Sequence, residues 1–105
     1  MSNSKLFVHG FRNYLSLEDR KTMLINLFSQ YGKIKIINNP RTGVDEEAII
    51  FIRDKEKEGV VYKNFCFVEM EDEEAAHAVL EHCANVDFEG GIKLSTSLAK
   101  AKEEE

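Results

Sequence analysis

The octapeptide KNFCFVEM, residues 63–70, alternates between two sets of side chains. Phe65 and Phe67 share one parity, and the residues of the other parity are also apolar: Cys66, Val68 and Met70. Successive side chains of a strand point to opposite faces of a sheet, so this stretch predicts a strand with apolar groups on both faces. One face must meet the core. What the phenylalanines on the other face meet decides what the fold is used for.

The chain has 105 residues, of which 43% are hydrophobic and 31% charged, so it is long enough for one core and too short for two. No apolar stretch approaches the about 18 residues that a membrane span needs, and the first residues lack the apolar run of a secretory signal. We therefore expect a single domain that is located inside the cell and does not bind a membrane. The sequence does not distinguish nucleus from cytoplasm.

Signals of catalysis are weak throughout the sequence. Cys66 and Cys83 lie in apolar patterns without metal-type spacing, so we expect both to be reduced core residues. No metal-ligand cluster, phosphate loop or nucleophile motif is recognisable, so we predict no enzyme, metal or cofactor. The enzyme alternative is an acylphosphatase-like sandwich that uses Arg12 and Asn13, but the glycine-rich anion cradle for that chemistry is missing.

Cap and turn signals divide the chain into six segments. Ser16, with Asp19 three residues later, has the spacing of a capping box and starts a helix that Gly32 would end, and Asp72 caps a second helix. Strands are expected at 5–11, 48–53, 60–70 and 92–97. The order strand, helix, strand, strand, helix, strand predicts an α+β sandwich with two helices on one face of a four-stranded antiparallel sheet.

This order and two motifs resemble the RNA recognition motif family over residues 5–100. The family octamer reads Lys/Arg, Gly, Phe/Tyr, Gly/Ala, Phe/Tyr, hydrophobic, any residue, Phe/Tyr, and KNFCFVEM matches it except at Asn64, Cys66 and Met70. The first-strand hexamer of the family is matched by LFVHGF, residues 6–11. The resemblance implies a ferredoxin-like βαββαβ fold. Asn64 stands where the family has a glycine close to the ligand.

The resemblance also implies a site. Phe7, Phe65 and Phe67 are expected to stack bases of single-stranded RNA on an open sheet face, and Lys63 to contact phosphate. The opposite parity of Leu6 and Val8 agrees, because these residues would turn to the helices. Four further residues are expected at the border of the open face: His9, Arg53, Lys93 and Lys100.

The charge balance keeps a second function open. With 14 basic and 19 acidic residues the chain has a net charge of -5, which argues against nucleic-acid binding by bulk electrostatics. The alternative is a protein-interaction module of the same fold, with little or no RNA binding. It would dock a partner on the sheet face or on an acidic helix surface.

The predicted domain runs from residue 5 to 100, between a flexible N-terminus (1–4) and an acidic tail (101–105). Compared with the family, about a dozen extra residues separate Gly32 from Asp54, so residues 38–47 are expected to be an insertion. Two interpretations stay open. The insertion is an inert loop or an added contact surface, or else residues 34–37 form an extra or extended edge strand.

Overall fold

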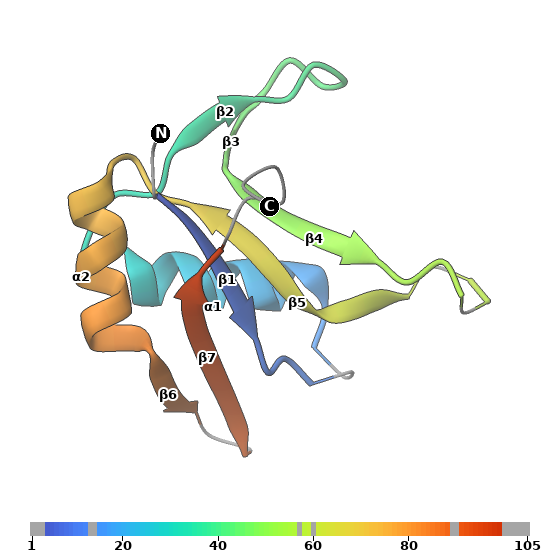
Figure 1. The fold of residues 1–105 in the computed structure, drawn as a ribbon. Coiled ribbons are helices and arrows are strands. Elements are labelled where there is room, and N and C mark those ends of the chain that lie inside the picture. Colours follow the sequence, from blue (N-terminus) through green and yellow to red (C-terminus); the bar gives the residue numbers. More distant parts are fainter. Residues whose placement is uncertain (1–3, 13–14, 57, 60, 89–90, 100–105) are drawn as a thin grey trace, which may run out of the picture.

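The computed structural model describes residues 4–12, 15–56, 58–59, 61–88 and 91–99, and it confirms the predicted fold class (Figure 1). Two helices pack on one face of an antiparallel sheet whose strand order is β4-β5-β1-β7-β6. The elements in chain order are β1 (Lys5–His9), α1 (Leu17–Phe28), β2 (Ile36–Asn38), β3 (Asp45–Glu47), β4 (Ile49–Arg53), β5 (Tyr62–Glu69), α2 (Glu73–Cys83), β6 (Asn85–Phe88) and β7 (Ile92–Leu98).

The sheet has a fifth strand, β6, in addition to the four that we predicted. Val86 and Phe88 pack against the core, whereas Asn85 and Asp87 are exposed, so β6 alternates as an edge strand should. It pairs antiparallel with β7, with Phe88 opposite Ile92. Four residues directly after a helix are too short a pattern to separate from a turn by sequence alone.

The predicted insertion contains a β-hairpin in which β2 pairs with β3, in a two-stranded sheet of its own, so the extra strand expected at 34–37 is found at Ile36–Asn38. The ribbon leaves the main sheet at Ala48. Its N–H donates to the Lys35 carbonyl at 2.8 Å, while its own carbonyl accepts from the Glu69 N–H at 3.0 Å. Figure 1 shows the hairpin projecting beyond the start of β4, away from the rest of the sheet.

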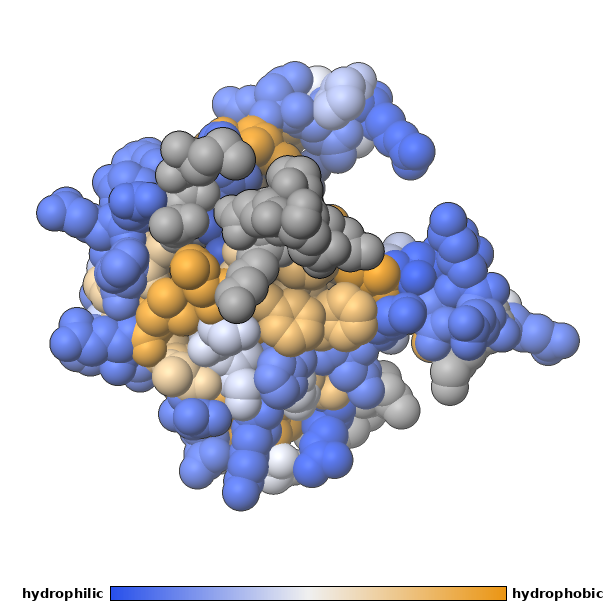
Figure 2. Space-filling view, viewed as in Figure 1, coloured by the Kyte–Doolittle hydropathy of each residue, from blue (hydrophilic) through white to orange (hydrophobic). Residues whose placement is uncertain are grey.

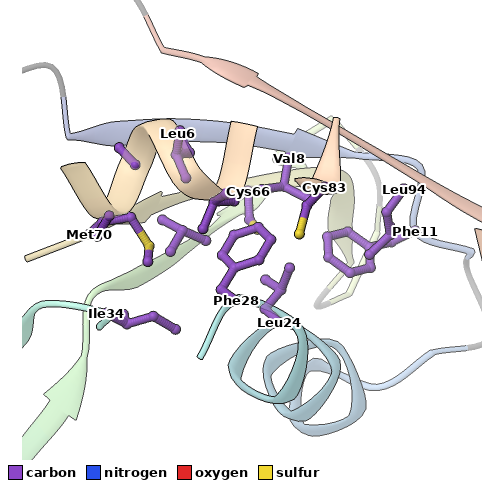
Figure 3. Packing of buried hydrophobic residues seen from close by; sticks show 14 of the residues in the cluster. Leu6, Val8, Phe11, Leu24, Phe28, Ile34, Cys66, Met70, Cys83 and Leu94 are labelled. Carbon is purple, nitrogen blue, oxygen red and sulfur yellow. The ribbon is translucent and has the colours of Figure 1, made fainter. Parts of the chain in front are cut away.

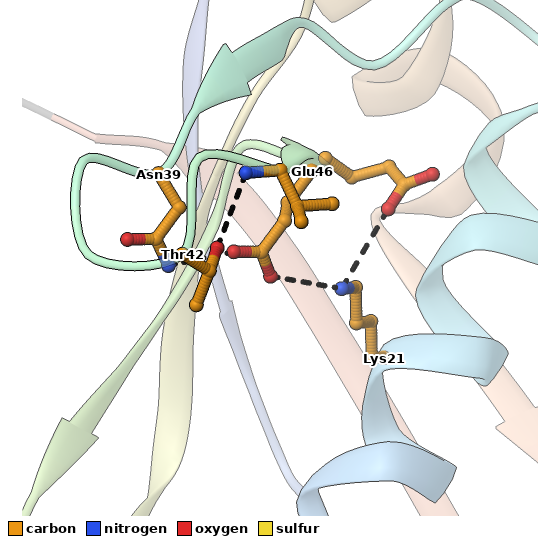
Figure 4. Close-up of polar contacts among 6 residues, drawn as sticks. Lys21, Asn39, Thr42 and Glu46 are labelled. Atoms are coloured by element: carbon orange, nitrogen blue, oxygen red, sulfur yellow. Dashed lines mark hydrogen bonds and ion pairs between the residues drawn. The ribbon is translucent and has the colours of Figure 1, made fainter.

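Side chains hold this hairpin beside α1 (Figure 4). The Lys21 Nζ lies 3.6 Å from Glu46 Oε1 and 3.7 Å from Glu47 Oε1. Asn39 donates to the other Glu46 oxygen at 2.7 Å, which ties the turn of the hairpin to β3. Because these groups are partly exposed, each ion pair contributes at most about 1 kcal/mol, so they set orientation more than stability.

Both predicted helix starts are confirmed. Ser16 Oγ accepts from the Asp19 N–H at 3.0 Å, and Asp72 Oδ1 accepts from the Ala75 N–H at 2.8 Å. The predicted end of the first helix was wrong, since α1 ends at Phe28, before Gly32. A Cβ on Gly32 would lie 2.5 Å from the Ala75 Cβ, so this glycine allows the turn after α1 to approach the start of α2.

The core lies between the sheet and the helices (Figure 3). From the two central strands, five side chains with 0% exposure enter it: Leu6, Val8, Cys66, Val68 and Met70, the last just after β5. They meet Leu24 and Phe28 of α1 and Val79 and Cys83 of α2. The parity that we predicted for β1 and β5 is therefore confirmed, and the three phenylalanines lie on the opposite face.

Only Ser4 of the predicted N-terminus lies within the described residues, and the predicted acidic tail lies outside them. Ser4 is buried, and its carbonyl accepts from the Met70 N–H at 2.8 Å. The chain is thus paired to the main sheet from one residue before β1.

The two cysteines are free and buried as predicted, and we expect them to be unreactive in the native protein. Burial raises the pKa of the Cys66 thiol to about 12 and also raises the pKa of Cys83, so little thiolate forms near neutral pH. In 5,5′-dithiobis(2-nitrobenzoate) assays at pH 8, both thiols should react no faster than the chain unfolds, and at once in urea. Rapid reaction of the native protein would contradict this packing.

The same pKa has a consequence for stability at high pH. Since the folded state holds the Cys66 proton more tightly than the unfolded state, its contribution is complete below about pH 9, the ordinary thiol value, and falls as the pH rises toward about 12. Wild type should therefore lose stability relative to a Cys66→Val variant over this range in urea denaturation. Parallel pH profiles of the two proteins would show that burial does not control this thiol.

Candidate functional site

Three phenylalanine rings meet on the sheet face opposite the helices. Phe7 of β1 pairs directly with Phe67 of β5, and their ring centroids are 5.6 Å apart. The Phe65 centroid lies 5.4 Å from that of Phe7 and 6.3 Å from that of Phe67. All three side chains are half-buried, and among the described residues neither helix covers them. We call this surface the phenylalanine face, and Figure 2 shows apolar atoms gathered at its centre.

Strand register extends the face in two rows across the sheet. One row contains Ile50 of β4, Phe67, Phe7 and Ser97 of β7. The next row contains Phe65, His9, Ser95 and Asn85. The first row is mostly apolar, and Ile50 is 47% exposed at its end. The second row changes from aromatic to polar groups as it passes from β5 to β6.

His9 is brought to the phenylalanine cluster, as predicted. Its side chain is exposed, and its ring centroid lies 5.4 Å from that of Phe7 with an interplanar angle of 34°. The imidazole thus continues the aromatic surface by one further ring. It also adds ring nitrogens that can donate or accept hydrogen bonds.

Two lysines lie over the phenylalanine rings. Lys63, a predicted site residue, is exposed and has its Nζ 5.9 Å from the Phe65 centroid. The Lys5 Nζ lies 5.3 Å from the Phe67 centroid. Sequence reasoning missed Lys5, although its parity with Phe7 is the signal that would have found it. An ammonium over a ring face is attracted by the ring quadrupole, so both cations are held next to the cluster.

The other predicted border residues differ in position. Lys93 is exposed and shares its parity with the outward residues of β7, and its register partner on β6 is Asp87. Arg53 is exposed and is the register partner of Tyr62, beyond an irregularity in the pairing of β4 with β5. Among the described residues, the cations that lie over the rings are Lys5 and Lys63 and not Arg53. Lys100 lies outside the described residues.

Positively charged side chains lie near the phenylalanine face, although the chain as a whole has a negative net charge. Glu69, which points to this face, is paired with the Lys35 Nζ at 3.4 Å. At the rings themselves the described cations are Lys5 and Lys63, and Glu69 is the register partner of Lys5. Two lysines thus bring positive charge next to the rings, although the net charge of the chain is -5.

A buried arginine fastens the strand that carries Lys63 and Phe65. Arg20 of α1 is 3% exposed, and its guanidinium donates to three main-chain carbonyls, those of Arg12 (3.2 Å), Leu15 (3.2 Å) and Lys63 (3.1 Å). Burial lowers the pKa of Arg20 from its ordinary value. The planar fork of arginine suits several fixed acceptors, so this residue joins the loop after β1 to the start of β5.

The backbone at the same place explains one departure from the family octamer. The Asn64 carbonyl accepts from the N–H groups of Gly10 (3.1 Å) and Phe11 (3.3 Å). No described residue other than glycine has a positive φ, so Asn64 fits where the family has a glycine. The backbone freedom is needed instead at Gly10, whose φ is 114° and whose Cβ would lie 2.0 Å from the Lys93 carbonyl oxygen.

Features for other functions are sparse in the described part of the chain. It contains no group of three or more metal-ligating side chains and no helix long and apolar enough to cross a membrane. Arg12, which the enzyme alternative requires, donates its Nη2 hydrogen to the Gly91 carbonyl at 3.0 Å. Asn13 lies outside the described residues.

Comparison with known proteins supports the fold. No protein-family model and no curated protein matches the chain. Among solved structures, the chain is similar to one titled "Sxl-lethal protein/RNA complex", with a TM-score of 0.60 and 24% sequence identity over 92% of this chain. The match covers 48% of that chain, so this protein spans about half its length. The likeness shows that the fold is like that of an RNA recognition motif.

We expect Arg20→Met to destabilise the protein by about 3 kcal/mol, because three partly buried carbonyls would lose their charged donor, and each such group left unsatisfied costs about 1 to 3 kcal/mol before local relaxation. Urea denaturation followed by circular dichroism measures the change. The matched control is Lys21→Met at the next position of α1, which removes only partly exposed ion pairs and should cost at most about 1 kcal/mol. Equal effects of the two substitutions would contradict the fastening role of Arg20.

Proposed function

We propose that this chain is an RNA recognition motif that binds single-stranded RNA inside the cell by stacking bases on Phe7, Phe65 and Phe67. The observation that carries the proposal is the cluster of three half-buried rings on a sheet face that no helix covers within the described part of the chain. Exposed aromatic rings attract flat apolar ligands, and stacking of a base on such a ring contributes about 1 to 3 kcal/mol. Two or three stacked bases would give a usable affinity.

Charge and motif support the same function. Lys5 and Lys63 lie next to the rings, where they would meet the phosphates of a strand whose bases stack on the face. The octamer and hexamer motifs fall on β5 and β1, the central strands that carry the rings. The similar solved structure is titled as an RNA complex. Few cations surround the face, so we expect modest affinity with a shallow dependence on salt.

A second candidate function rests on Ile50. This side chain is 47% exposed and stands opposite Phe67, so the apolar surface continues onto the edge strand β4, whose aromatic residue, Phe51, packs against the core instead. An aliphatic extension contributes little to base stacking but suits the apolar side of a peptide or helix. In this alternative the phenylalanine face docks a protein, and Ile50 matters as much as the rings.

Substitution of the rings separates the two functions. Phe65→Ala and Phe67→Ala should each weaken RNA binding about 5- to 150-fold, the equivalent of one lost stacking contact. Phe65→Tyr and Phe67→Tyr keep the ring and should bind nearly as wild type, and Ile50→Ala should leave RNA binding unchanged. Fluorescence anisotropy with a labelled pool of eight-nucleotide RNAs measures each affinity, and circular dichroism verifies folding. Equal binding by wild type and the double alanine variant would refute base stacking.

Salt dependence tests the role of Lys63. Each phosphate contact to single-stranded nucleic acid contributes about -0.7 to the slope of log K against log salt concentration. Lys63→Gln should therefore make that slope shallower by about 0.7. The affinity is measured by fluorescence anisotropy at about five NaCl concentrations between roughly 50 and 300 mM. The control is Lys21→Gln, on α1 behind the sheet, which should leave the slope unchanged. Identical slopes for wild type and Lys63→Gln would remove Lys63 from the phosphate contacts.

A further inference from the structure

We propose that Asn85 and Ser95 select the base beside the Phe7 stack and favour uracil and guanine over cytosine and adenine. The inference rests on the proposed function, because it requires RNA on the phenylalanine face. It assigns a role to β6, the strand that sequence analysis did not predict, and it names the chemical group on the base that this strand would contact.

Register places this pair next to the aromatic surface. Ser95 is the partner of His9 on β1 and also of Asn85 on β6, so the three side chains follow one another across the sheet. Neighbouring strands are about 4.8 Å apart, so Ser95 and Asn85 are the first two polar groups beyond the His9 ring. A base stacked over the rings of Phe7 and His9 would turn one edge toward them.

The hydrogen bond between the two side chains leaves the Asn85 amide with donors but no free acceptor toward a ligand. Ser95 Oγ donates to Asn85 Oδ1 at 3.1 Å, which occupies the amide oxygen. The Asn85 Nδ2 keeps two N–H donors, and among the described residues it has no partner. Asn85 is exposed, so these donors are available to a ligand.

Two free donors distinguish the bases by the exocyclic group that they carry. Uracil O4 and guanine O6 are acceptors, whereas cytosine N4 and adenine N6 are amines that only donate. An amide N–H₂ that faces a keto oxygen forms a hydrogen bond, and one that faces an amine leaves donors unpaired on both sides. The pair therefore favours a keto base at this position.

The pair is suited to a base edge and not to the sugar-phosphate backbone. Both side chains are uncharged, and the lysine nearest along β7 is Lys93, whose register partner on β6 is the acidic residue Asp87. Phosphate contacts position a strand through cations, whereas sequence is distinguished by hydrogen bonds to bases. Core packing of Val86 and Phe88 fixes β6, so the position of Asn85 is set by buried neighbours on its own strand.

The test compares eight-nucleotide oligouridylate with oligocytidylate, whose bases differ at the keto or amino group and the adjacent ring nitrogen. Wild type should bind oligouridylate about tenfold more tightly, which corresponds to about 1.4 kcal/mol. Asn85→Asp keeps the acceptor for Ser95 and removes the donors, so the ratio of the two affinities should fall to one or below. Ser95→Ala frees the amide to turn and should bring the ratio close to one.

The affinity ratio cancels the uniform effect of the added aspartate charge, and circular dichroism verifies that both variants fold. Equal binding of the two RNAs by wild type, or a ratio that neither variant changes, would overturn the role of the pair. If the phenylalanine variants lose RNA binding while the ratio stays constant, base stacking stands and only this inference fails. If wild type binds neither RNA, both proposals fail.

Discussion

The alternation of side chains along β1 and β5 is the constraint on which the rest of the structure depends. These central strands are hydrogen-bonded to each other, so their parities are locked together, and Leu6 enters the core from the same face as Val68. A slip of one residue in either strand would move phenylalanines under the helices and core residues into solvent. The aromatic surface and the hydrophobic core are therefore specified by a single pairing, and neither can change without the other.

That pairing is secured at the end of β1, where the chain must turn from the sheet to α1. The Arg20 guanidinium donates to two carbonyls of the loop after β1 and to one carbonyl of β5. The Asn64 carbonyl of β5 accepts from the N–H groups of the first two residues of that loop. Gly10 lets the backbone pass over β7 at a distance that no side chain would allow. The rings thus rest on a strand end held by buried polar contacts, which preorganises them for a flat ligand.

Local patterns predicted much of this arrangement, because parity, caps and motifs depend on neighbours in the chain. Ser16, Asp72 and the outward phenylalanines were all predicted from such patterns and are found where expected. The features that were not predicted from the sequence depend on contacts with residues far away in the chain. Gly32 matters for Ala75 and not for a helix end, and β6 exists because β7 offers it an edge. Arg53 was expected at the open face, and it lies beyond an irregular stretch in the pairing of β4 with β5, where simple alternation does not assign its face.

The departure of the β2–β3 ribbon at Ala48 limits the length of the free edge of the main sheet. The outermost strands of the sheet, β4 and β6, span only five and four residues, and the ribbon bends away just before β4 begins. Short, interrupted borders are poor templates for strand addition by another copy of the chain. The rings therefore lie on a sheet whose edges offer few consecutive main-chain groups to a strand of another molecule.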